Sequence, residues 1–321
     1  MLNIDKIDKK LLQNLDFDVR VPVSSLAKAV NLSKQGVDYR IKRLQKNGVI
    51  LGYYPVINTH KLGYHYCRFF IKLQNITREK ENEILKAIKD DTRFKWLLRG
   101  EGNYDILCAS YLKTLSDFKK LSEEIFTKWG NNISLKREST GIRIHNLPSR
   151  HIWRSHDDRA VAVGETEEVI RIDETDKKIL TGLSQNARIP LIELAKKLSM
   201  SSSAILYRLH RLEKNGIVLA YRPIINHAAL GFLHYKVLFY LAEGTEEELK
   251  KFKEYLKTNL AVIYMVEEIG ICDIDVELMV ESSHDFYEFI RELKFTFPQM
   301  IKSYDSFIIT ETIKINYLPF D

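Results

Sequence analysis

The chain has 321 residues, and its 45% hydrophobic content with only seven prolines indicates globular cores throughout. It has no run of about 18 uncharged apolar residues, and the N-terminal MLNIDKIDKK lacks an apolar signal region, so we expect a soluble, cytoplasmic protein with no membrane partner. Three cysteines and nine histidines show neither disulfide nor metal-ligand spacing, so we predict no metal, no cofactor and no catalytic residue.

Two segments of the chain repeat each other. Residues 4–63 and 172–231 align without a gap at a constant offset of 168 and are identical at 27 positions. The net charge of +6 is modest, but the repeats hold a basic excess: ten Lys and Arg against five Asp in 1–60, and nine against five acids in 172–228. A basic surface favours contact with phosphates, although many basic helices are only solvated. Charge alone therefore leaves nucleic-acid binding open.

The first copy predicts three helices in chain order. Asp5 caps the first, with Asp8 at its third position and apolar residues following at helical spacing. Pro22 suits the first turn of the second helix. After a short turn, Ser33 caps the third, which ends before Gly48. Three helices with a tight turn before the last predict a helix-turn-helix core.

The third helix is the element expected to read DNA. Its inward residues are Val37, Ile41 and Leu44 in the first copy and Ile205, Leu209 and Leu212 in the second. The opposite face is mostly polar, and the first residues of such a helix enter the major groove. The DNA-binding candidates are Ser33, Lys34, Gln35, Tyr39, Arg40, Lys42, Arg43, Ser201, Ser202, Ser203, Tyr207, Arg208 and Arg211.

The arginines of this helix recur in both copies and have two interpretations. They clamp phosphates, or they form salt bridges to acids on the first helix. For Arg43 and Arg211 we prefer the phosphate clamp, whereas for Arg40 and Arg208 both interpretations stay open.

The segment after each repeat predicts elements in the order βαββαβ, which is typical of a ferredoxin-like sandwich. In the first half the strands are expected at 66–73, 94–98, 104–112 and 133–144 and the helices at 77–89 and 116–129. In the second half the strands are expected at 234–241, 262–267, 272–280 and 301–315, with one helix from Thr245, where Glu248 completes a capping box, and another at 283–297.

The predicted fold class is α+β: two winged or trihelical helix-turn-helix domains alternate with two ferredoxin-like βαββαβ effector sandwiches. The helix-turn-helix domains span 1–60 and 172–228, and the sandwiches span 61–147 and 229–321. Residues 148–171 between the halves are mixed in charge and weakly patterned, and we interpret them as a linker in which Trp153 is anchored against a domain.

One ordered pattern occurs twice: D-x-x-D-x-x-(I/L)-L, then L-A, then S-x-x-x-(V/I)-x-x-R-(I/L)-x-R-L and Y-x-P-x-I-N-x-x-x-L-G. It runs from Asp5 to Gly63 and from Asp173 to Gly231. The pattern resembles the Lrp/AsnC, or feast/famine, family of transcription regulators. The matching residues in the first copy are Asp5, Asp8, Leu12, Arg20, Pro22, Leu26, Ala27, Ser33, Val37, Arg40, Arg43, Leu44, Gly48, Tyr53, Pro55, Asn58, Leu62 and Gly63.

The resemblance implies a sequence-specific regulator that binds double-stranded DNA, with sandwiches paired about a twofold axis. Because this chain holds two such units, we expect a single-chain pseudo-dimer. Its unlike recognition helices should read an asymmetric operator. A homo-oligomer of such chains remains open.

A further shared motif, G-x-x-D, lies between two predicted strands of each sandwich and resembles the family's effector loop, which implies an amino-acid effector. The implied effector-binding residues are Glu101, Gly102, Asn103, Asp105, Gly270 and Asp273. The structural alternative is a tight turn that glycine permits and aspartate caps. Because Glu267 and Glu268 make the second loop more acidic and less suited to a carboxylate ligand, we expect the first half to be the one that binds if only one half does.

Two other functions stay open. A branch of the same superfamily resembles these regulators in fold but decarboxylates siroheme, and His65, His234, Arg68 and Arg99 are the residues that this chemistry would use. The other alternative is a ligand-binding scaffold without DNA binding.

Overall fold

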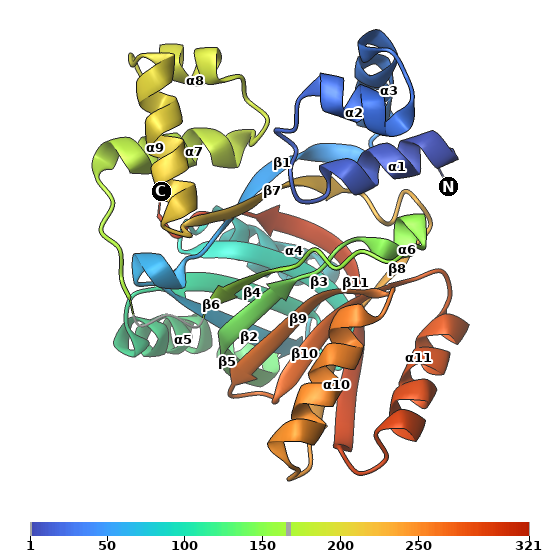
Figure 1. Ribbon diagram of the computed structural model, residues 1–321. Coiled ribbons are helices and arrows are strands. Elements are labelled where there is room, and N and C mark those ends of the chain that lie inside the picture. The colour runs from blue at the N-terminus through green and yellow to red at the C-terminus, as the bar shows by residue number, and fades with distance from the viewer. Residues whose placement is uncertain (1, 165–167, 321) are drawn as a thin grey trace.

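The computed structural model describes residues 2–164 and 168–320. Both predicted helix-turn-helix units are present at one end of the molecule (Figure 1). The first comprises α1 (Lys6–Leu15), α2 (Val23–Val30) and α3 (Lys34–Lys46), and the second α7 (Glu174–Gln185), α8 (Leu191–Lys197) and α9 (Ser202–Lys214).

Local chemistry sets the ends of these helices as predicted. The Asp5 carboxylate accepts hydrogen bonds from the amides of Ile7 and Asp8, and Asp8 returns the bond as a capping box. The Ser33 hydroxyl accepts from the amide of Gly36 at the start of α3. Gly48 follows α3 with a φ of 72°, the left-handed conformation that glycine adopts freely.

A two-stranded ribbon joins the two helix-turn-helix units. The strand that follows each unit, β1 (Ile50–Ile57) or β7 (Val218–Ile225), pairs with its counterpart in the antiparallel sense. Apolar residues of both units belong to one continuous core, which includes Leu12 and Leu180. The two units are therefore packed as one body.

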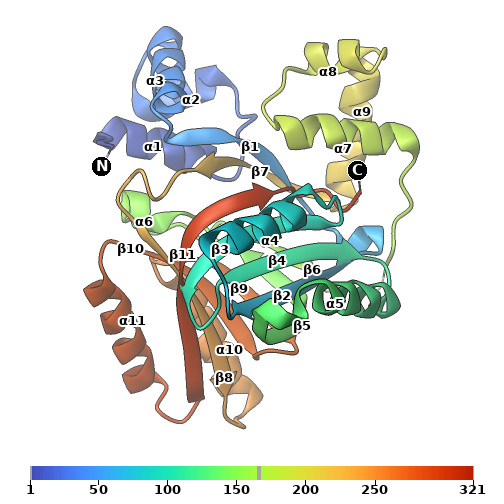
Figure 2. The same ribbon diagram turned by 180° about the vertical axis from the view of Figure 1, so that it is seen from behind.

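Each half also contains the predicted sandwich (Figure 2). The first consists of β2 (His65–Leu73), α4 (Arg78–Asp90), β3 (Phe94–Gly102), β4 (Ile106–Leu112), α5 (Leu115–Trp129) and β5 (Ile133–Asn146), with short 3-10 turns at His60–Leu62 and Gly130–Asn132. The second consists of β8 (Leu233–Leu241), α10 (Glu246–Thr258), β9 (Val262–Ile269), β10 (Ile274–Val280), α11 (Ser283–Thr296) and β11 (Ile301–Ile315).

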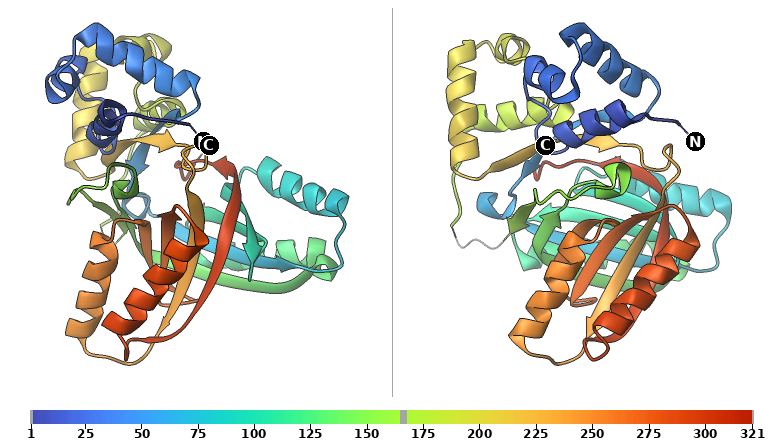
Figure 3. Two further views of the ribbon diagram at one scale, coloured as in Figure 1. Left: turned by 90° about the vertical axis from the view of Figure 1, so that its right-hand side faces the viewer. Right: turned by 45° about the vertical axis from the view of Figure 1, so that its right-hand side comes forward.

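The two sheets close into one antiparallel barrel (Figure 3). Its strand order is β2-β4-β3-β11-β8-β10-β9-β5, and the pairing of β5 with β2 completes the ring. The last strand of each half begins beside its own sheet and continues beside the other: β11 pairs with β3, and β5 pairs with β9. Strand β3 runs past its predicted end because β11 pairs with it as far as Gly102.

The barrel has an outer face covered by helices and an inner face between the halves. Successive residues of a strand point to opposite faces. Phe69 lies in the core under the helices of the first half, whereas Phe70 packs inside with Leu238 and Phe307 of the second half. The sandwiches therefore share their inner faces.

The segment expected to be a linker contains regular structure within its residues 148–164. It contains a short helix, α6 (Arg150–Trp153), and a strand, β6 (Val161–Gly164), that pairs with β5. Trp153 packs against the helix-turn-helix core, as predicted. In the two described stretches of the chain, no helix is both long and apolar enough to cross a membrane.

Candidate nucleic-acid interface

The recognition helices α3 and α9 expose the faces that were predicted to read DNA. Val37 and Ile205 are fully buried, which fixes the opposite faces toward solvent. Tyr39 and Tyr207, at one equivalent position, are 66% and 69% exposed. Lys34, at the start of α3, is exposed as well. These exposed side chains can therefore enter a groove of duplex DNA without any rearrangement of the protein core.

The arginines of α3 turn back toward α1. Arg40 Nη1 lies 2.7 Å from an Asp5 carboxylate oxygen and 2.9 Å from Asp8 Oδ1. Arg43 Nη2 lies 2.6 Å from Asp8 Oδ2. The Asp8 carboxylate is fully buried, so these two guanidinium groups balance its charge.

The second copy repeats this arrangement around the fully buried Asp176. Arg208 contacts Asp173 at 2.8 Å and Asp176 at 2.9 Å, and Arg211 contacts Asp176 at 2.5 Å. In the unbound chain all four arginines thus form the salt bridges that were the alternative interpretation, including Arg43 and Arg211, for which we preferred the phosphate clamp. A phosphate contact from any of them stays a prediction.

The outward faces of the two recognition helices differ in chemistry. Lys34 and Gln35 of α3 correspond to Ser202 and Ser203 of α9. Lys42 forms an exposed ion pair of 2.7 Å with Asp38, and such a pair contributes little and leaves the lysine available. At the positions of Asp38 and Lys42, α9 carries Leu206 and His210.

The G-x-x-D loops adopt the turn that was their structural alternative. Gly102 and Gly270 have φ values of 123° and 129°. The Asp105 carboxylate accepts hydrogen bonds from the amide of Leu73 at 2.7 Å and from Lys72 Nζ at 2.6 Å. The equivalent bond joins Asp273 to the amide of Leu241 at 2.7 Å. Both aspartates therefore tie the turn to the neighbouring strand.

These loops also lie at the seams between the halves. A Cβ atom on Gly270 would stand 2.4 Å from the carbonyl oxygen of Glu138, which belongs to the other half. Asn103 donates a hydrogen bond of 2.8 Å to Asp305 across the other seam, where β3 meets β11, while Glu101 is exposed. The motif alone did not predict which strands meet at each seam, because that pairing joins segments distant in sequence.

An open hollow of about 480 Å³ borders the second loop, although we expected a ligand at the first. Glu267, Glu268 and Asp273 lie along it. Burial raises the pKa of Glu267, but hydrogen bonds from His145 and Lys253 outweigh it and lower that pKa to about 2. These three carboxylates are therefore already paired, with Glu267 bound to His145 and Lys253, Glu268 to Arg68, and Asp273 to the amide of Leu241.

The barrel interior contains a charge network that the sequence did not predict. Arg68 forms ion pairs with Asp275 and Glu268. Lys236 Nζ lies 2.7 Å from Asp275 and 3.0 Å from Glu277. Burial raises the pKa of Glu277, but Lys236 and a hydrogen bond with His234 outweigh it and hold that pKa below its usual range. The signal was present as charged residues within otherwise apolar strands.

The four residues offered for tetrapyrrole chemistry do not gather. Arg68 is buried in the interior, His234 is half-buried and contacts Glu277 of the interior network, His65 is exposed, and Arg99 pairs with Glu81 at 3.2 Å on the outside of the barrel. The cavity beside Arg68 encloses about 50 Å³, enough for a few waters, whereas sites for larger ligands occupy roughly 300–1,000 Å³.

Comparisons with known proteins agree with the two helix-turn-helix units. A family model for the AsnC-type helix-turn-helix domain matches residues 4–45, and one for winged helix-turn-helix DNA-binding matches residues 172–218. An uncharacterized HTH-type transcriptional regulator of Pyrococcus furiosus is 32% identical over 126 residues, covering 38% of this chain and 80% of that protein. Regulatory protein AsnC of Haemophilus influenzae is 27% identical over 117 residues, covering 36% and 77%.

A solved structure matches nearly the whole chain. The siroheme decarboxylase NirDL is similar over 97% of this chain and 93% of its own, with a TM-score of 0.64 and 14% sequence identity. At that identity the likeness shows the fold alone.

Proposed function

Because the chain belongs to the Lrp/AsnC family of transcription regulators, we propose that it binds double-stranded DNA sequence-specifically as a single-chain pseudo-dimer. The observation that carries the proposal is the pair of exposed recognition helices, α3 and α9, at one end of the molecule (Figure 1). The two helix-turn-helix units share one apolar core, so a single chain presents two recognition helices without a second copy. We also propose that the protein acts in the cytoplasm, as a regulator that binds DNA there.

The operator in this proposal is asymmetric. A homodimer presents two identical helices and reads a palindrome, with half-sites about 34 Å apart. Here Lys34 and Gln35 face one half-site, and Ser202 and Ser203 face the other. A lysine or glutamine pairs with different base edges from a serine. The two half-sites should therefore differ in sequence.

An amino-acid effector remains part of the proposal. The G-x-x-D loops support it only by their position, because they join the two halves and a ligand there would act on how the halves pack. The residues proposed to meet it are those around Asp105 and Asp273.

A mobility-shift titration tests the proposal. The chain should bind specific duplex DNA with an affinity that falls steeply as salt rises, since each phosphate contact contributes a slope of about 0.9 in log–log form. Replacing Lys34 and Lys42 by Ala should weaken binding and reduce that slope. The matched control replaces Lys250 and Lys302, which are exposed on the second sandwich, and should leave the slope unchanged.

Two results would contradict the proposal. One is the absence of any duplex binding at low salt. The other is a shifted absorption band when siroheme is added to a chain that does not bind DNA, which would favour the enzyme alternative.

A further inference from the structure

The two halves carry different charges on the faces that they share inside the barrel. Equivalent positions are 168 residues apart, as the strand registers confirm: Arg68 pairs with Ala109 between β2 and β4, and Lys236 pairs with Glu277 between β8 and β10. Each half therefore contributes one buried cation at the same place, and both side chains are 1% exposed.

Among the described residues that form the network, only those of the second half contribute carboxylates to the barrel interior. They are Glu268, Asp275 and Glu277, all buried. Their equivalents in the first half are Gly100, Leu107 and Ala109. The first half thus has a cation without an acid, and the second half has more acids than cations.

The network crosses between the halves as this imbalance requires. Arg68 of the first half pairs with Asp275 and Glu268 of the second. From its own half the described contacts of Arg68 include no carboxylate: its Nε donates to Ser139 Oγ at 3.2 Å, and its guanidinium lies over the rings of Tyr66 and Phe70. A buried guanidinium without a carboxylate is strongly unfavourable, so the first half depends on the second for this charge.

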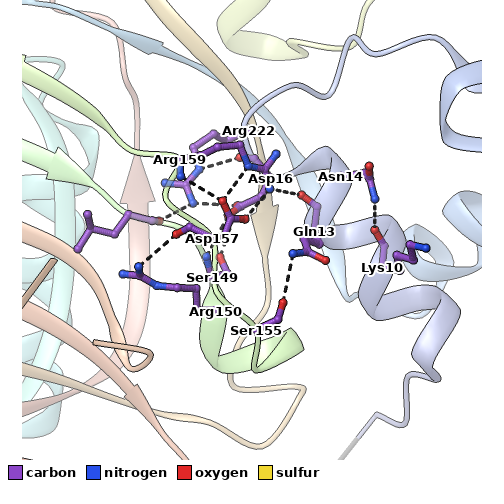
Figure 4. A network of polar contacts seen from close by, with 11 residues as sticks. Lys10, Gln13, Asn14, Asp16, Ser149, Arg150, Ser155, Asp157, Arg159 and Arg222 are labelled. Carbon is purple, nitrogen blue, oxygen red and sulfur yellow. Dashed lines mark hydrogen bonds and ion pairs between the residues drawn. The ribbon is translucent and has the colours of Figure 1, made fainter. Parts of the chain in front are cut away.

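A second contact between the halves is unequal in the same way (Figure 4). Arg222 on β7 reaches Asp16, at the end of α1, with 2.8 Å between its Nη2 and the carboxylate. It also donates to the carbonyl oxygen of Leu147 at 2.9 Å. Both charged side chains are buried, and their equivalents are Tyr54 and Ser184.

We propose that these buried charges form a pairing code: the first half fits only a partner that carries the acids of the second. Two first halves would bury two arginines with no carboxylate in the network. Two second halves would bury six carboxylates against two lysines. These charges therefore disfavour symmetric pairing between equivalent halves of two copies of the chain. They also disfavour pairing with one-unit relatives whose inner faces lack these acidic residues. The code concerns pairing and stands whether or not the chain binds DNA.

A double-mutant cycle in the full chain tests the energetic link between the halves. Arg68→Met and Asp275→Leu should each lower the melting temperature by about 10 °C, because the first leaves Glu268 without a cation and the second takes a buried carboxylate from both Arg68 and Lys236. The double variant should lose clearly less than the sum of the two single losses, since Asp275 and Arg68 are partners and removing one already removes part of what the other contributes. Melting temperatures equal to the wild type in the single variants, or additive losses in the double variant, would overturn the proposal.

A relocation variant separates pairing from stability. Leu107→Asp with Asp275→Leu moves one carboxylate to the equivalent place in the first half and leaves the total charge unchanged. This variant should melt above Asp275→Leu alone. After unfolding and joint refolding of two differently tagged copies, it should form mixed two-copy species several times more often than the wild type does. A mixed fraction equal to that of the wild type would show that the charges stabilise the barrel without selecting the partner.

The cycle keeps the test decisive if the relocation variant does not fold. DNA binding is read separately by mobility shift, so failure of the pairing code and failure of the proposed function give different results.

Discussion

A buried aspartate organises the arginines of each recognition helix. Asp8 accepts from Arg40 and Arg43, and Asp176 repeats the arrangement in the second unit. The sequence predicted both the acids and the arginines, but it left two partners for each arginine. Which partner each arginine takes depends on how α1 packs against α3. The spacing of residues along a single helix does not predict that packing.

The buried acids make the first prediction. Asp8→Asn removes the charge that two guanidinium groups balance, so it should lower the free energy of unfolding by about 3 kcal/mol. Asp176→Asn should have a similar effect, and Asp38→Asn, at an exposed pair, should change it by less than about 1 kcal/mol. Denaturant unfolding measures all three. An Asp8→Asn variant as stable as the wild type would mean that the arginines are held by other contacts.

At the scale of elements, prediction was good where local chemistry decides. The caps at Asp5, Ser33 and Thr245 formed as expected, because each needs only residues three positions apart. Prediction was poorer where the bounds of a strand depend on a pairing partner that is distant in sequence. Strand β3 is lengthened by β11, and β6 forms only because β5 offers it an edge.

The unlike recognition helices make the second prediction. Replacing Lys34 and Gln35 by Ser gives α3 the opening residues of α9, so the preferred site should become more nearly palindromic. Each lost base contact should remove about 1–3 kcal/mol of discrimination at its position. The reciprocal variant, Ser202→Lys with Ser203→Gln, should shift the other half-site. Binding-site selection with each variant measures this, and an unchanged site in both would exclude these residues as base readers.

In the whole molecule, two features could not be predicted from the sequence. One is the closure of the barrel, and the other is the folding of residues 147–164, here called the strap. The family resemblance predicted that the two sandwiches pair within the chain, but not that the last strand of each continues beside the other and closes a barrel. The strap looked weakly patterned because its partners, Asp16 and Arg222, come from two different units.

The strap also makes stability depend on pH. His151 lies 2.9 Å from His227; His151 is buried and His227 is half-buried. Burial, His234 and Arg222 lower the pKa of His227 to about 3, and burial with His227 and His234 holds the pKa of His151 well below its usual value. Below about pH 6.5 the unfolded chain binds protons at these residues that the folded chain does not.

Stability should therefore fall as the pH drops from 7 to 5, by about 1.4 kcal/mol per residue for each pH unit below 6.5. The variant His151→Gln with His227→Asn keeps a neutral hydrogen bond and should flatten this dependence. His210→Asn, at an exposed position on α9, is the matched control. Thermal melts across this range measure the effect, and an equal slope in wild type and double variant would contradict it.

Selection of bound duplexes from a random pool tests the central claim, that one chain presents two unequal reading heads. We expect one site per chain, made of two different half-sites with centres about 34 Å apart. A symmetric palindrome with equal tolerance in both halves, or no enriched site at all, would contradict it.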